Sequence, residues 1–145
     1  MRARGMVKIG FLMALNVMVG LPVGASQESA YGPEVKSFLE FMRHEDDELE
    51  YQIQHGEITR RDYVRSKNRH AIQRQAVLQI VKETGQDVVP DLYVKTAAEL
   101  DQLIEGGVRA LRGVKRGDVI RDKWRYCGKA AKGEVFYIFE RLAKM

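Results

Sequence analysis

Apolar residues recur at helical spacing in two long segments of the chain. In residues 33–54 they lie mostly three or four positions apart, with a charged interruption at 43–48, and this spacing predicts an amphipathic helix. A second helix is predicted from Arg60 to about Glu83, because Thr59 is well suited to cap its first turn. Only a few residues join the two segments, so we expect an antiparallel helical hairpin.

The turn of this hairpin has a recognisable sequence. Residues 56–59 read GEIT and are followed by Asp62, which suits the positive end of a helix, and by Tyr63. This turn resembles that of the SHOCT domain, a small helical hairpin, and the resemblance covers about 25 residues. It implies the hairpin and implies no activity.

The charges of the two helices predict how they face each other. If the hairpin folds about Glu57, Glu45 lies opposite Arg69 and Asp47 lies opposite Lys67, so we expect ion pairs at these positions. The apolar residues are concentrated at the open end of the hairpin. We expect that end to enter the core and the middle of the hairpin to stay partly solvated.

Shorter patterns follow the hairpin. Residues 86–95 contain Pro90 and several β-branched residues, which predicts an extended connection. Thr96 and Glu99 have the spacing of a capping box, which predicts a short third helix. The glycines at 106–107 then end this helix.

The end of the chain has the clearest β pattern. Residues 119–127 and 134–142 are rich in β-branched and aromatic residues and flank the sequence GKAAKG, which predicts an antiparallel β-hairpin with a loop of about 4–6 residues. A lone hairpin is unstable in water, and residues 86–95 are the best candidate for a third strand. We therefore predict an α+β fold, with a helical hairpin at 33–84 and a short helix plus β-hairpin at 85–145.

The first 25 residues have the three parts of a secretory signal peptide. Residues 1–8 are basic, residues 9–23 are almost wholly apolar, and residues 23–25 (VGA) suit a signal peptidase. We expect cleavage after Ala25 and export of residues 26–145, as one small domain, to the periplasm or the extracellular space. The apolar run is shorter than the roughly 20 residues of a membrane span, so we expect no span in the mature chain, with an uncleaved anchor as the alternative.

Removal of this segment changes the charge of the protein. The full chain of 145 residues has a net charge of +4, whereas the shortened chain has 21 basic and 20 acidic residues, a net charge of +1. Residues 26–57 carry −7, residues 58–82 carry +6, residues 83–107 carry −5 and residues 108–145 carry +7. Such blocks favour contacts between segments of one chain. The small remaining excess argues against a nucleic-acid partner.

The acidic run of the first helix gives one candidate metal site. His44 and Glu48 are four residues apart, so they share a helix face, and the hairpin brings His70 near them. Imidazole and carboxylate groups that converge on one point can hold a metal ion. No HExxH pattern is present, and the other interpretation is a solvated, ion-paired helix face.

A basic face on the predicted strand 119–127 gives a candidate anion site. Arg121, Lys123 and Arg125 alternate along the strand, so they are expected on one face, with Trp124 on the other. Such a face can bind a polyanion or an anionic component of the cell envelope. The alternative is a solvated strand face that contacts the acidic segments.

Cys127 is the one cysteine of the chain. A single cysteine excludes an intramolecular disulfide and a cysteine-based zinc or iron–sulfur site. We expect a half-buried structural thiol, with a disulfide to another molecule as the alternative.

The sequence contains no recognisable catalytic constellation and no cofactor-binding motif. We therefore expect a non-catalytic interaction or structural protein of the cell envelope, with a protein or envelope component as its partner. The alternatives are an anion-binding module that uses the basic strand face and a small metal-binding protein that uses the helical hairpin.

Overall fold

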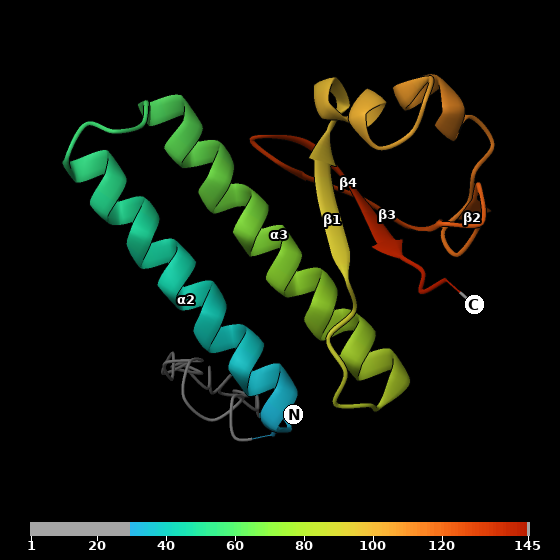
Figure 1. The fold of residues 1–145 in the computed structure, drawn as a ribbon, viewed down its shortest axis with the longest axis horizontal. Helices are drawn as coiled ribbons and strands as arrows, with labels where there is room; N and C mark the ends of the chain where they lie inside the picture. Colours follow the sequence, from blue (N-terminus) through green and yellow to red (C-terminus); the bar gives the residue numbers. More distant parts are fainter. Residues whose placement is uncertain (1–29, 145) are drawn as a thin grey trace, which may run out of the picture.

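The computed structural model describes residues 30–144, and Figure 1 shows a helical hairpin beside a sheet. The predicted signal peptide lies outside the described residues. The hairpin consists of α2 (Pro33–Gln54) and α3 (Arg60–Thr84). The remaining elements are β1 (Leu92–Thr96), the 3₁₀ helices η1 (Ala97–Gln102) and η2 (Gly107–Leu111), and the strands β2 (Val119–Ile120), β3 (Trp124–Lys132) and β4 (Glu134–Arg141). The predicted α+β class and the helical hairpin are confirmed.

The strands form one antiparallel sheet in the order β1-β4-β3-β2. Residues 86–95 do supply the third strand, although only their last residues and Thr96 are extended in β1. The predicted β-hairpin is present as β3 and β4. The short β2 strand adds a fourth strand that the sequence did not indicate.

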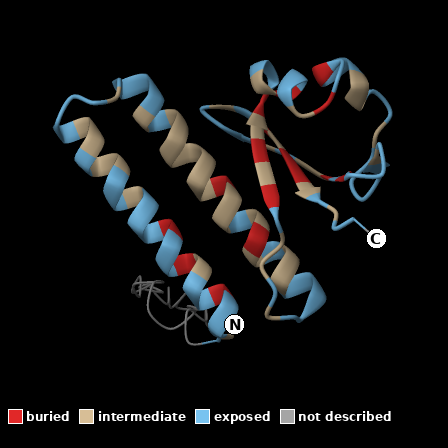
Figure 2. Cartoon of the chain, in the orientation of Figure 1, coloured by how far each residue is buried: buried red, intermediate tan, exposed pale blue. Residues whose placement is uncertain are grey.

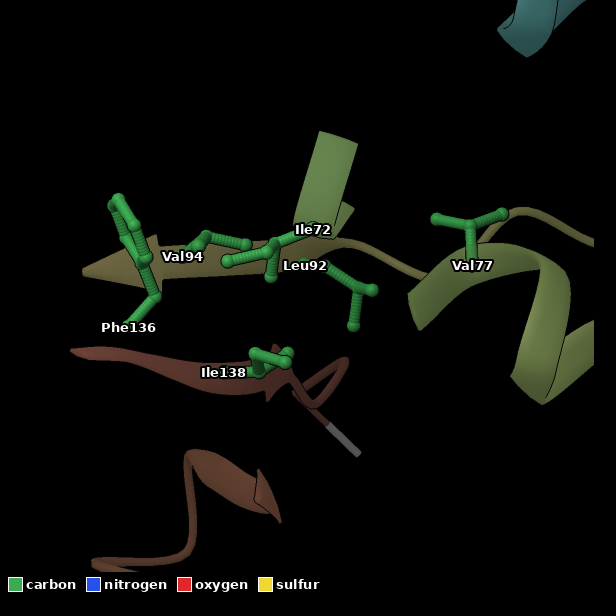
Figure 3. Close-up of a cluster of buried hydrophobic side chains, with 6 residues drawn as sticks. All are labelled: Ile72, Val77, Leu92, Val94, Phe136 and Ile138. Carbon is green, nitrogen blue, oxygen red and sulfur yellow. The ribbon is translucent and has the colours of Figure 1, made fainter. Parts of the chain in front are cut away.

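Two hydrophobic clusters hold the layers together, one on each face of the sheet. The first joins α3 to β1 and β4, and Figure 3 draws its members: Ile72, Val77, Leu92, Val94, Phe136 and Ile138. The second joins the sheet to the 3₁₀ segment and consists of Leu100, Ile104, Trp124, Tyr126 and Phe139. Phe136 and Phe139, both fully buried, point to opposite faces because side chains alternate along a strand.

α3 lies between the sheet and α2, so among residues 30–144 α2 is the outermost layer on that side (Figure 1). Its buried residues are Val35, Leu39 and Met42, all near the open end of the hairpin. The apolar end therefore enters the packed part of the protein, as predicted.

Residues after α3 anchor the start of α2. The backbone N–H groups of Glu34 and Val35 each donate a hydrogen bond of 3.0 Å to the Asp87 carboxylate. Gly32, the N-cap of α2, has no side chain to cap the helix, and a Cβ there would lie 2.3 Å from Asp87. Asp87 thus supplies the cap from a distant part of the chain, and Gly32 leaves room for it.

The ends of α3 follow the predicted signals. The Thr59 side chain accepts a hydrogen bond of 3.1 Å from the Asp62 backbone N–H. Gly85 ends the helix with φ of 67°, a left-handed conformation that glycine adopts without steric strain.

Two features of the β prediction are wrong. The expected strand 119–127 is broken at residues 121–123, and β2 folds back onto β3. Arg121 and Asp122 have φ of 51° and 54°, so charged residues occupy a tight left-handed turn that the alternating pattern hid. Trp124 and Tyr126 can then enter the second cluster from a separate strand.

The expected loop GKAAKG (128–133) is also mostly strand. β3 continues to Lys132 and the chain reverses at Gly133. The small residues of this segment predicted a loop, but Ala130 lies in β3 and packs against the first cluster, which includes Ile72 and Val77 of α3. The predicted third helix begins at the expected capping box of Thr96 and Glu99, but it is a 3₁₀ helix.

Candidate interaction surface

The inner face of the hairpin is held by a polar cluster around Asp46. The side chain of Asp46 is only 16% exposed and accepts hydrogen bonds from His70 Nδ1 at 2.8 Å and from Arg74 at 2.9 Å. Lys67 Nζ lies 3.5 Å away, and Lys67 also pairs with Glu50 at 3.6 Å. α3 therefore neutralises the acids on the inner side of α2.

These contacts lower the pKa of Asp46. Partial burial alone would raise that pKa, but the hydrogen bonds from His70 and Arg74, and the charges of Arg74 and Lys67, hold it below its ordinary value. The Tyr63 hydroxyl near the tip donates a hydrogen bond to Glu50, which raises the pKa of Tyr63. The middle of the hairpin is thus polar and internally paired.

The predicted ion pairs of Glu45 with Arg69 and of Asp47 with Lys67 are wrong in detail. Lys67 contacts Asp46 and Glu50, and Arg69 donates to Glu99 at 2.8 and 2.9 Å. The reason is that α3 lies between two layers, so only one side of it faces α2. Arg69 lies on its other side, where Glu99 joins the helix to the start of η1.

The outer face of α2 carries a stripe of exposed side chains at helical spacing. We define this outer stripe as Ser37, Phe41, His44, Glu48, Tyr51 and His55. Phe41 is 56% exposed and Tyr51 is 51% exposed. Figure 2 shows exposed residues along the length of this helix. Within residues 30–144 no element covers the stripe.

Part of the outer stripe is ordered by its own contacts. The rings of Tyr51 and His55 are stacked with centroids 3.9 Å apart. His55 Nδ1 also donates to the Tyr51 carbonyl at 2.8 Å. The stack presents a flat aromatic surface close to the end of α2.

Acidic side chains flank the outer stripe. Glu40, Glu45 and Asp47 are exposed and have no ion pair within the described part of the chain. They contrast with Asp46 and Glu50, which α3 pairs. The sequence showed the acidic run but could not separate its paired members from its solvent-facing ones.

The three residues of the candidate metal site do not converge. His44 and Glu48 lie in the exposed outer stripe, whereas His70 points to the inner face and bonds to Asp46. Glu48 instead accepts a hydrogen bond of 3.0 Å from Gln52. No group of three or more His, Cys, Asp or Glu side chains within residues 30–144 is arranged to hold a metal ion.

The three residues of the candidate anion site do not share one strand face, so that geometric prediction is wrong. Arg121 lies in the β2–β3 turn and pairs with Glu105 at 3.2 Å. Arg125 lies in β3 and pairs with Glu140 at 2.7 Å. Lys123 Nζ lies 5.2 Å from the centre of the Trp124 ring.

Cys127 lines a shallow hollow of about 400 Å³ between α3 and β3. Burial raises the pKa of its thiol, and the charge of Glu140 adds to the rise. A thiol that stays protonated is a weak nucleophile. Cys127 is half-buried, as expected.

Comparisons of the chain with protein-family models, curated proteins and solved structures found no match. No family match therefore supports the resemblance of the turn at 56–59 to the SHOCT domain.

Neither α2, α3 nor any other helix within residues 30–144 has the length and hydrophobicity to cross a bilayer.

Proposed function

We propose that the protein is a non-catalytic interaction protein of the cell envelope and that the outer stripe of α2 binds its partner. One observation carries the proposal: Phe41 and Tyr51, each more than half exposed, lie on the same face of α2, the outermost helix of the described residues 30–144. The signal-like pattern of residues 1–25 supports the envelope location.

The exposed aromatics are large enough to drive binding. Covering about half of an aromatic side chain removes on the order of 100 Å² from water, which is worth about 2.5 kcal/mol at about 25 cal/mol per Å². Two such residues on one ridge have the size of binding hot spots. The paired inner cluster supports this use of the helix, because it fixes which face of α2 points outward.

The proposal can be tested by photo-cross-linking in cells that naturally produce the protein. A photoreactive benzoylphenylalanine is placed at Phe41 or Tyr51, and at Val108 or Val135 as matched controls. The controls are 43% and 42% exposed and lie outside the hairpin. We expect adducts from the two stripe positions and none from the controls. Equal adducts at all four positions, or none at the stripe, would contradict the proposal.

A further inference from the structure

We infer that the partner contacts the outer stripe through a cationic amphipathic helix rich in lysine or arginine. This inference rests on the proposed function and adds the chemistry of the partner. The inference is carried by a difference between the two faces of α2. The acids that face α3 are paired with its basic residues. Within residues 30–144, Glu40, Glu45 and Asp47 on the flanks of the stripe have no ion pair.

The charge of α2 sets the sign of the partner. Residues 33–54 contain seven acidic and two basic residues. Two of the acids, Asp46 and Glu50, are paired with α3, which leaves five acids against the two bases. Outward-facing carboxylates repel an anionic surface and attract a cationic one, and this effect steers association. An acidic protein segment or an anionic lipid surface is therefore disfavoured on this face.

A second copy of the chain is disfavoured for the same reason. A two-fold symmetric contact places the same patch of both molecules face to face. Two outer stripes would then bring the unpaired acids of both copies together, and like charges at an interface weaken binding. The occupant is therefore expected to be a different molecule.

The shape and aromatic content of the stripe favour a helix with cationic side chains. Its members follow one ridge from Ser37 to His55, and a long straight ridge suits a helix laid alongside it. Guanidinium and ammonium groups stack on aromatic rings. The chain itself makes such contacts, with Arg60 lying 5.6 Å from the centre of the Tyr63 ring. Phe41 offers a similar ring surface to a partner, and Tyr51 offers the ring face that His55 does not cover.

Titration with designed peptides tests this inference. The probe is a labelled peptide with leucine and lysine at amphipathic helical spacing, and its counterpart has glutamate in place of every lysine. We expect the lysine peptide to bind, the glutamate peptide not to bind, and binding to weaken as salt screens the charges. Fluorescence anisotropy of the purified protein with each peptide measures the dissociation constant.

Variants assign the binding to the stripe. The triple variant Glu40→Gln, Glu45→Gln, Asp47→Asn and the single variant Phe41→Ala are each expected to weaken binding about tenfold. The matched control removes three exposed negative charges elsewhere, through Asp91→Asn, Asp101→Asn and Asp122→Asn. It is expected to change binding less than about twofold, since these acids lie outside the hairpin. Circular dichroism confirms that each variant is folded.

The outcomes separate the two proposals. Equal binding of both peptides, no binding of the lysine peptide, or equal losses in the stripe and control variants would overturn the inference. If one of these results is obtained but Phe41 gives an adduct in cells, the proposed interaction stands and only the cationic chemistry of the partner is wrong. If the stripe gives no adduct in cells, the proposed function fails and this inference fails with it.

Discussion

Asp46 and Asp47 are neighbours in the sequence, yet the structure assigns them opposite roles. Asp46 faces α3, with 16% of its side chain exposed, whereas Asp47 faces solvent. Replacing each with asparagine removes one negative charge and leaves the size of the side chain nearly unchanged. The pair therefore tests which face of α2 points inward, and hence whether the outer stripe is free to bind.

The structure gives a magnitude for each change. Asp46→Asn replaces charge-assisted hydrogen bonds at 2.8 and 2.9 Å, from His70 and Arg74, with weaker neutral ones. Hydrogen bonds to charged groups stabilise by about 1.5–3 kcal/mol, and part of that is kept by the amide oxygen. We expect the free energy of unfolding to fall by about 1–2 kcal/mol. For Asp47→Asn we expect a change within about 0.5 kcal/mol.

The effect of Asp46→Asn depends on pH with a defined sign. The pKa of Asp46 is lowered in the folded state, so its stabilisation is fully present above the ordinary aspartate range of about 4. It is lost as the pH falls through the lower pKa of the folded state. Urea unfolding of both variants and the unchanged protein, at pH 7 and near pH 3, measures this. We expect the difference for Asp46→Asn to shrink at the lower pH.

Two results would refute this account of the hairpin. Equal destabilisation by the two substitutions would mean that Asp46 and Asp47 have similar surroundings. A difference for Asp46→Asn that grows in acid would mean that its carboxylate is not stabilised by the cations of α3.

Three further predictions concern other parts of the molecule. Asp87→Ala should lower the free energy of unfolding by about 1–2 kcal/mol, because the N-terminal cap of α2 is lost. The exposed control Asp91→Ala should lower it by less than about 0.5 kcal/mol, and similar urea midpoints for the two variants would contradict the role of Asp87 as a cap. Arg121→Asn should raise the free energy of unfolding by about 0.5 kcal/mol, because asparagine tolerates the left-handed conformation better and the exposed pair with Glu105 that it removes contributes little. A loss of stability would contradict strain at this turn. Cys127 should react with iodoacetamide at pH 8 more slowly in the folded protein than in urea, since burial raises its pKa; equal rates would show that the thiol is not shielded.

Local signals predicted the helical hairpin because they act within a few residues. The cap at Thr59, the terminator at Gly85 and the helical spacing all lie inside the elements they define. The capping box at Thr96 and Glu99 was found for the same reason. The cap from Asp87 to α2 was not found, since it joins residues more than fifty positions apart.

The candidate surface depended on contacts that a sequence pattern does not contain. The acidic run was visible, but only the packing of α3 shows that Asp46 is paired and Asp47 is not. Arg69 was predicted to pair with Glu45 of α2, but it pairs with Glu99 in η1, a residue 30 positions away that the pattern of the hairpin does not include. The basic strand face was lost at Arg121, where a left-handed turn replaces an extended residue.

Hydroxyl-radical footprinting tests the central claim, that the outer stripe is covered by a partner, most directly. The oxidation rates of Phe41 and Tyr51 are measured in the purified protein and in the intact envelope fraction of cells that produce it. Tyr137, on the other face of the sheet and partly buried, serves as the reference. We expect Phe41 and Tyr51 to be oxidised readily in the purified protein and protected in the envelope, with Tyr137 unchanged. Equal oxidation of Phe41 and Tyr51 in both samples would contradict the claim.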